Sequence, residues 1–184
     1  SALQPEAPVH YEDLNLIVCH LGGGVSVGVH RHGRAVDVPN ALDGFGPFSP
    51  ERAGTLPAGQ LIDLCHSGRY TTEELKKRIS GKADIPAIER RIAEGDTHAA
   101  LVLDAMIYRI AKEIGGAAVV LYGKVDAILL TGGMAHSEYI TSRLQERVSF
   151  LAPVHVYPGE DELEALVMNA LGALRGELPV QVYR

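Results

Sequence analysis

The chain has 184 residues, of which 46% are hydrophobic and 22% charged, and its formal net charge is −6. This length and composition predict a globular protein with one core or two small ones. The acidic balance argues against a nucleic-acid-binding protein, which normally presents a basic face. No apolar run approaches the roughly 18–20 residues of a membrane-spanning helix, and the N-terminal SALQPEAPVH lacks the pattern of a signal peptide.

The cysteines indicate the redox compartment. Cys19 and Cys65 each lie within an apolar pattern, and neither belongs to a CxxC motif. Buried free thiols in a reducing cytosol are therefore favoured over a disulfide. We expect a cytoplasmic protein with neither a nucleic acid nor a membrane as its partner.

The N-terminal part of the chain predicts a small meander of strands. Residues 1–10 are unpatterned and interpreted as a linker or a ragged start. Apolar runs and alternation then predict three short strands, and short turns predict that they are antiparallel neighbours. These strands contain Leu16–Val18, the alternating valines 25, 27 and 29, and Ala35–Val38. Residues 39–56 follow without periodicity, and a loop of that length is usually functional or disordered.

Helices and strands alternate through the rest of the chain. Apolar periodicity and capping residues predict six helices and two strands. The helices are expected at 57–67, from Thr71, at 84–95, at 97–121, from Ser137 to 148 and at 161–174, and the strands at 125–130 and 154–157. Thr71 and Glu74 form a capping box at the start of the second helix. Strands followed by helices, after a three-strand start, predict an α/β fold.

The long predicted helix at 97–121 is apolar on more than one face. One face is marked by Leu101, Ala105, Tyr108, Ala111 or Lys112, Gly115 and Ala118, and another by Val102, Met106, Arg109 and Glu113. The Gly115-Gly116 pair weakens a helix by about 1 kcal/mol per glycine, so we interpret it as allowing close packing or the approach of a ligand. The helix is predicted to pack either inside the domain or across a dimer.

Two glycine-rich turns follow strands and are candidate phosphate-binding elements. The first is HLGGG, residues 20–24, and the second is TGG, residues 131–133. Glycine turns and helix N-termini direct N–H groups at phosphate, although a glycine pair after a strand is more often only a tight turn. Neither sequence fits a Walker A motif or a GxGxxG fingerprint. Two such turns in one α/β domain suggest a nucleotide held between them.

Three further features each allow two interpretations. His20 is either a half-buried histidine with a backbone partner or a group that stabilises charge on a transferring phosphoryl group. Arg52 is either a surface charge or part of the same chemistry. The acids Glu160, Asp161 and Glu162 begin a predicted helix, where they either complement the helix dipole or help to hold Mg²⁺.

Four motifs, in this order, resemble those of a known enzyme family: HLGGGVSVG, DVPNALDGFGPFSPERAG, ILLTGGMAHSE and VYPGEDELEAL. They are similar to the acyl kinases of the butyrate-kinase type, in the acetate-kinase branch of the actin-like ATPase superfamily. The resemblance runs from Tyr11 to the C-terminus. It implies that residues 11–184 form a ribonuclease H-like, C-terminal nucleotide-binding lobe, a mixed sheet flanked by helices, without the N-terminal lobe. Such kinases usually carry about ten more residues near 81–84, and Phe45 stands where they tend to have an acid.

The resemblance also implies a function. It is the reversible, ATP-dependent phosphorylation of a short-chain carboxylate, such as butyrate or a branched-chain relative, with ATP or ADP and Mg²⁺, in at least a homodimer. Arg52 and His20 would be catalytic, and Asp161 and Glu162 would organise the metal. Nucleotide binding would fall to eight residues: Gly22, Gly23, Gly24, Ser26, Gly132, Gly133, Met134 and Ser137. The alternatives are a lone nucleotide-binding lobe acting as a non-catalytic interaction module and, more remotely, a sugar kinase or an Hsp70-like ATPase.

Overall fold

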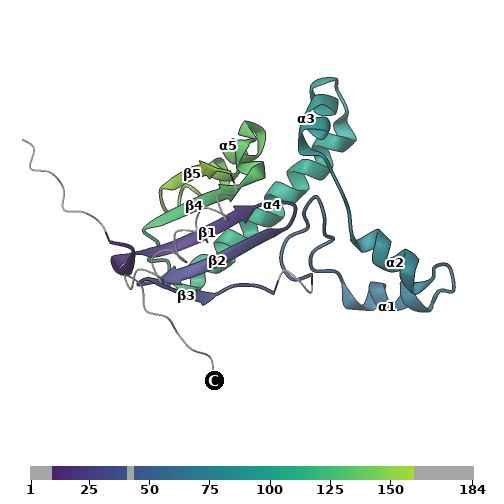
Figure 1. Ribbon diagram of the computed structural model, residues 1–184, viewed down its shortest axis with the longest axis horizontal. Helices are drawn as coiled ribbons and strands as arrows, with labels where there is room; N and C mark the ends of the chain where they lie inside the picture. Colours follow the sequence, from purple (N-terminus) through teal and green to yellow (C-terminus); the bar gives the residue numbers. More distant parts are fainter. Residues whose placement is uncertain (1–9, 41–43, 160–184) are drawn as a thin grey trace, which may run out of the picture.

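A computed structural model describes residues 10–40 and 44–159, which are built around a five-stranded mixed sheet (Figure 1). The strand order across the sheet is β3-β2-β1-β4-β5. The strands are β1 Asn15–Leu21, β2 Val25–Arg31, β3 Arg34–Asp37, β4 Ala127–Gly132 and β5 Val154–Pro158. Strands β1, β2 and β3 are antiparallel neighbours, whereas β4 and β5 continue the sheet parallel to β1. The predicted meander and the mixed α/β sheet are both confirmed.

Five α-helices and two short 3₁₀ turns connect and cover the described strands. They are η1 Tyr11–Asp13, α1 Ala58–His66, α2 Thr72–Ile79, α3 Ile85–Ala93, α4 Thr97–Val120, η3 Gly133–His136 and α5 Glu138–Val148. The predicted helices of this part of the chain are therefore confirmed, with ends shifted by one or two residues. The predicted helix at 161–174 lies outside the described residues.

Local capping explains where several helices begin. Thr71 accepts a hydrogen bond from the Glu74 N–H at 3.2 Å, and the Glu74 carboxylate accepts one from the Thr71 N–H at 2.8 Å, which confirms the predicted capping box. Asp96 opens α4 by accepting from the Ala99 N–H at 2.9 Å. The bond from Ala99 is the main cause that lowers the pKa of the Asp96 carboxyl below its usual value. The second cause is a hydrogen bond that the Arg91 Nε donates to the same carboxylate at 2.9 Å.

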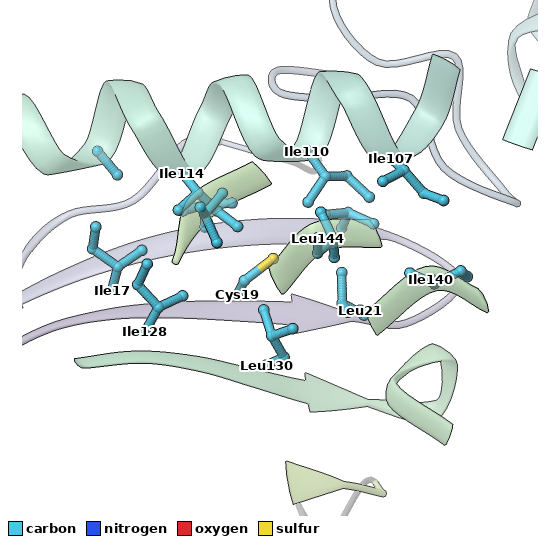
Figure 2. Close-up of a cluster of buried hydrophobic side chains, with 14 of the residues drawn as sticks. Ile17, Cys19, Leu21, Ile107, Ile110, Ile114, Ile128, Leu130, Ile140 and Leu144 are labelled. Atoms are coloured by element: carbon cyan, nitrogen blue, oxygen red, sulfur yellow. The ribbon is translucent and has the colours of Figure 1, made fainter. Parts of the chain in front are cut away.

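The hydrophobic core lies between one face of the sheet and helices α4 and α5 (Figure 2). Alternate residues of β1 and β4 point to this side, as strand periodicity requires. They meet α4 and α5 in a layer of side chains that are at most 1% exposed: Ile17, Cys19, Leu21, Ile128, Leu130, Ile107, Ile110, Ile114, Ile140 and Leu144. Each large apolar side chain buried in this way contributes about 1.5–3 kcal/mol.

The two cysteines are free thiols, as predicted, but only one of them is buried. Burial in the core, with a smaller contribution from Glu113, raises the pKa of the Cys19 thiol to about 12. Cys65 is exposed on α1, so its predicted burial is wrong. The reason is tertiary: within the described residues α1 buries no side chain, and α2 buries only Leu75. The α1–α2 pair extends away from the sheet (Figure 1).

The buried face of α4 differs from either face marked in the sequence. Its buried residues are Ala99, Leu103, Met106, Ile107, Ile110, Ile114, Ala117 and Ala118. Leu101 and Tyr108, from the first predicted face, are 66% and 48% exposed. Among the described residues, nothing lies within 4 Å of a Cβ placed on Gly115 or Gly116. No described helix is long and apolar enough to cross a membrane.

Candidate active site at the glycine turns

The two glycine-rich turns border a single pocket of about 340 Å³. Its walls include Gly22 and Gly23 from the first turn, Gly133 from the second, and Met134 and Ser137, which follow the second turn. Strands β1 and β4 are parallel neighbours, with His20 opposite Thr131, so their carboxyl ends meet at one edge of the sheet. Ligands of open α/β sheets bind at such edges. The structure therefore brings together the two turns that the sequence suggested for one nucleotide.

The first turn is covered by the loop that follows β3. The Gly23 carbonyl accepts hydrogen bonds from the Ser49 hydroxyl at 2.8 Å and from the Glu51 N–H at 3.0 Å. A Cβ on Gly23 would lie 2.6 and 2.7 Å from the two Glu51 carboxylate oxygens. The φ angles of residues 22–24 are not positive, so a side chain at position 23 would be opposed by the Glu51 carboxylate and not by backbone torsion. The Glu51 side chain is the part of the loop that comes closest to Gly23.

The same turn uses one of its own donors. The Gly22 N–H bonds to the Gly24 carbonyl at 3.0 Å, and this bond closes the turn. An anion at the turn must therefore be met by other N–H groups unless this bond opens. Beside it, a Cβ on Gly24 would lie 3.7 Å from the Arg52 guanidinium carbon. Arg52, predicted to be catalytic, thus lies directly against the first glycine turn.

A short stretch of backbone pairing holds this loop in place. Residues 50–53 run alongside residues 79–83 through three hydrogen bonds of 2.9–3.1 Å: Ala53 N–H to Ile79 O, Gly81 N–H to Glu51 O, and Ala83 N–H to Pro50 O. A Cβ on Gly81 would lie only 2.6 Å from the Pro50 oxygen, so glycine permits the pairing. The sequence analysis missed this anchor, because long-range pairing of two irregular segments leaves no periodic signal.

The second turn divides into a structural glycine and pocket residues. Gly132 adopts φ 89° and ψ 173°, and its N–H and carbonyl pair with Gly159 at 3.0 and 3.2 Å. A Cβ there would lie 2.6 Å from the Leu21 oxygen. Gly132 is buried and is not among the pocket's described lining residues, whereas Gly133 and Met134 are. Gly132 therefore has a structural role in joining the turn to the sheet, and its contact with a nucleotide stays a prediction.

Ser137 joins the pocket to two helices. Its hydroxyl oxygen accepts from the Ile140 N–H at 3.1 Å, which caps α5, and the same hydroxyl donates to the Glu89 carboxylate on α3. Both Ser137 and Glu89 line the pocket. The N-terminus of α5 therefore opens at the pocket, where the helix dipole favours a negative ligand.

His20 and Ser26 lie beside the pocket without lining it. His20 is half-buried on the face of the sheet opposite the core, and its Nδ1 lies 3.3 Å from the Thr131 hydroxyl oxygen. The strand register places Ser26 and Thr131 on either side of His20. The result is a row of polar side chains across the sheet, just before both glycine turns.

The described residues contain no cluster of three His, Cys, Asp or Glu side chains arranged to hold a metal ion. The predicted metal residues, Asp161 and Glu162, lie outside the described residues. The pocket wall does carry the carboxylates of Glu51, Asp84 and Glu89, which the sequence analysis did not single out for this role. Mg²⁺ is commonly bound by one or two carboxylates together with substrate phosphates. The donor chemistry of the pocket therefore fits this ion.

The mixed five-stranded sheet and its flanking helices have the actin-like ATPase fold. A solved structure with this fold is the acetate kinase of Porphyromonas gingivalis, which superposes with a TM-score of 0.77 at 22% sequence identity. The superposition covers 89% of this chain and 50% of that one.

The sequence itself then gives the family. The family model of the acetokinases matches residues 7–152. A probable butyrate kinase of Bacteroides thetaiotaomicron is 68% identical over 188 residues, covering 97% of this chain and 53% of that protein. A probable butyrate kinase of Phocaeicola vulgatus is 56% identical, covering 95% of this chain and 52% of that protein. The chain belongs to the acetokinase family.

The lengths of these matches add two facts. The chain spans about half the length of the curated relatives it matches. The alignment with the Bacteroides thetaiotaomicron protein is 188 residues long, although this chain has only 184, so that relative contains residues without a counterpart here. The expected shortened segment near 81–84 stays a prediction.

Proposed function

We propose that this chain is the nucleotide-binding lobe of a carboxylate kinase, which reversibly transfers a phosphoryl group between ATP and a short-chain carboxylate. The observation that carries the proposal is the meeting of two glycine turns at one pocket in a member of the acetokinase family. Butyrate or a branched-chain relative is the proposed substrate, because two close relatives are named probable butyrate kinases. We further propose a C-terminal position for the lobe in the whole enzyme, as the sequence motifs implied.

The chain's own residues suit phosphoryl transfer by positioning and charge stabilisation. A carboxylate is already a competent nucleophile, so the reaction needs no strong base, and catalysis rests on stabilising charge on the transferring oxygens. The planar guanidinium of Arg52, held against Gly24, supplies permanent positive charge and directed N–H donors. His20, at the end of β1, is proposed as a second contact to the transferring group.

The pocket residues supply the binding surface. Gly22 and Gly23 line the pocket from the first turn, Gly133 and Met134 line it from the end of β4, and Ser137 presents the N-terminus of α5. Glycine at these positions lets backbone approach a polyphosphate closely. The predicted contacts of Gly24, Ser26 and Gly132 belong to the same proposal.

Magnesium is the proposed metal, and when bound it neutralises part of the phosphate charge. Glu51 is the described carboxylate closest to the first glycine turn, and it is proposed to hold the ion together with the nucleotide phosphates. Asp161 and Glu162 stay predicted as further organising residues. A cytoplasmic location and a homodimer complete the proposal; the free thiols support the location.

A calorimetric titration with ATP·Mg²⁺, followed by a hydroxamate assay for acyl phosphate with butyrate, isobutyrate and acetate, tests the proposal. We expect saturable nucleotide binding by this chain and acyl hydroxamate formation by the whole enzyme. The matched variants are Gly23→Val, at a pocket-lining position where the atoms nearest to the new Cβ belong to the flexible Glu51 carboxylate, and Gly59→Val, whose Cβ meets nothing within 4 Å. Nucleotide binding should weaken at least about tenfold in the first and stay unchanged in the second.

The alternative function is a nucleotide-binding interaction module without turnover. It is supported by the pocket alone, because nucleotide binding needs no more than the glycine turns and the helix N-terminus that line it. Binding of ATP·Mg²⁺ with no hydroxamate product supports the module. Failure to bind nucleotide contradicts both functions.

A further inference from the structure

A second hollow borders the loop segment that carries Glu51 and Arg52. It has a volume of about 640 Å³ and is lined by residues 44–45, residues 51–56 and parts of helices α1 and α2, so we call it the arm groove. Glu51 lines both the arm groove and the nucleotide pocket. Arg52 lines the arm groove and also lies against Gly24 of the first glycine turn. The two hollows therefore meet at Glu51 and Arg52.

The arm groove is lined mainly by apolar side chains, three of which are large and exposed. Phe45, Leu56 and Ile79 are 61%, 37% and 42% exposed, and Leu61 of α1 adds a half-buried side chain. None of them belongs to the buried core between the sheet and α4. Apolar side chains that gather around a hollow without being buried are typical of a binding site.

Backbone hydrogen bonds hold these side chains in position. The Gly46 N–H donates to the Thr55 hydroxyl oxygen at 3.0 Å, and the Gly46 carbonyl accepts from the Thr55 N–H at 3.0 Å. These two bonds fix the part of the loop that carries Phe45. The bond from the Ala53 N–H to the Ile79 carbonyl, at 3.0 Å, fixes the end of α2 against the loop. The arm groove is therefore preformed, as small-molecule sites usually are.

The charged residues of the arm groove favour an anion. Arg52 and Lys76 carry positive charge, whereas the one acid of its described lining, Glu51, has its carboxylate oxygens near Gly23 of the nucleotide pocket. A guanidinium binds a carboxylate through two parallel N–H donors. A ligand with a carboxylate at one end and a hydrocarbon chain at the other therefore matches both the charge and the apolar lining.

We infer that the arm groove holds the hydrocarbon chain of the carboxylate substrate, and that Phe45, Leu56 and Ile79 select its length. The inference rests on the proposed function. With the carboxylate at Arg52 and the ATP phosphates at the first glycine turn, a carboxylate oxygen forms a bond to the γ-phosphorus. The bond from that phosphorus to the β–γ bridging oxygen breaks, and ADP leaves. Arg52 then lies where the contents of the two hollows react.

The apolar lining predicts a preference for longer chains. Each methylene group that moves from water to apolar surroundings raises affinity about fourfold. Butyrate has two methylene groups more than acetate, so kcat/KM of the whole enzyme should be about 15-fold higher for butyrate. The size of the groove permits this, because small-molecule sites usually measure roughly 300–1,000 Å³.

The test is a hydroxamate assay of the whole enzyme with acetate, propionate, butyrate and valerate. Phe45→Ala should lower the butyrate-to-acetate ratio of kcat/KM at least about fourfold, chiefly by raising KM for butyrate. Ala58→Phe adds a ring at an exposed, groove-lining position of α1 and should shift the preference toward shorter chains. Gln60→Phe is the matched control, because Gln60 is exposed on the same helix and is not among the described lining residues. Its ratio should equal that of the wild type.

A calorimetric titration with ATP·Mg²⁺ separates this inference from the proposed function. The dissociation constant should be the same in the wild type and all three variants. If another protein surface, such as a second lobe, covers the arm groove, Phe45→Ala and Ala58→Phe change kcat/KM for acetate and butyrate by the same factor. An unchanged ratio in both variants overturns the inference and leaves the proposed function standing. A wild-type whole enzyme that forms no acyl hydroxamate contradicts the proposed function and the inference with it.

Discussion

Replacing Gly132 with alanine tests how the second glycine turn is attached to the sheet. Its φ of 89° and ψ of 173° are almost restricted to glycine, and such strain costs about 1–3 kcal/mol. The new Cβ would also lie 2.6–2.9 Å from three backbone atoms of Leu21. That backbone is fixed, because β1 is paired on both sides. Overpacking of this kind costs a further 1–3 kcal/mol or so.

The two contributions together predict that Gly132→Ala loses about 2–6 kcal/mol of unfolding free energy. This is a large part of the roughly 5–15 kcal/mol typical of a domain. A chain of this length loses about 2–4 °C in Tm per kcal/mol, so thermal unfolding followed by far-UV circular dichroism measures the effect easily.

Two other glycines provide controls for this measurement. In Gly23→Ala the atoms nearest to the new Cβ belong to the movable Glu51 carboxylate, so the unfolding free energy should change by less than about 1 kcal/mol. Gly59→Ala meets nothing within 4 Å in the exposed helix α1 and should leave stability unchanged or raise it by up to about 1 kcal/mol. A Tm for Gly132→Ala within about 2 °C of the wild type would refute the reasoning.

Three further predictions concern charge and thiol chemistry. In the whole enzyme, Arg52→Ala should lower turnover on the order of 100-fold or more, whereas the surface control Arg90→Ala should not; normal turnover in the Arg52 variant contradicts the catalytic role of Arg52. The pKa of Asp96 is lowered in the folded state, so its stabilisation is complete above about pH 4 and is lost as the pH falls through the folded-state value. The Tm difference between the wild type and Asp96→Asn should therefore become smaller as the pH falls below about 4. A difference that does not change with pH would argue against stabilisation by the Asp96 carboxylate. One thiol, that of Cys65, should react with Ellman's reagent in the native protein and two after unfolding, because Cys19 is buried with a pKa raised to about 12; two fast native thiols would contradict the structure.

The α4 helix shows most clearly where sequence reasoning fails. Its apolar residues satisfy a 3.6-residue period on opposite sides, so periodicity alone could not decide which side enters the core. The sheet decides it, because Ile107, Ile110 and Ile114 meet the residues of β1 and β4 that strand alternation directs to the same side. The predicted burial of Cys65 failed for a related reason, since nothing in the local pattern of α1 says that the helix projects from the fold.

The sequence by itself determined what short-range chemistry controls. The capping box at Thr71, the strand alternation around Val27 and the two glycine turns each depend on residues a few positions apart, and each was read correctly as a local feature. Four ordered motifs also carried the resemblance to the acyl kinases, which the family match from residue 7 to 152 bears out.

Only the tertiary structure decided how those local features meet. The parallel pairing of β1 with β4, separated by more than a hundred residues, brings the two turns to one pocket. Pairing of residues 50–53 with 79–83 lays Glu51 and Arg52 over the first turn. Contacts of this kind arise from the closure of long chain segments around a shared core. For that reason they depend on the whole fold and leave no signature in any short stretch of sequence.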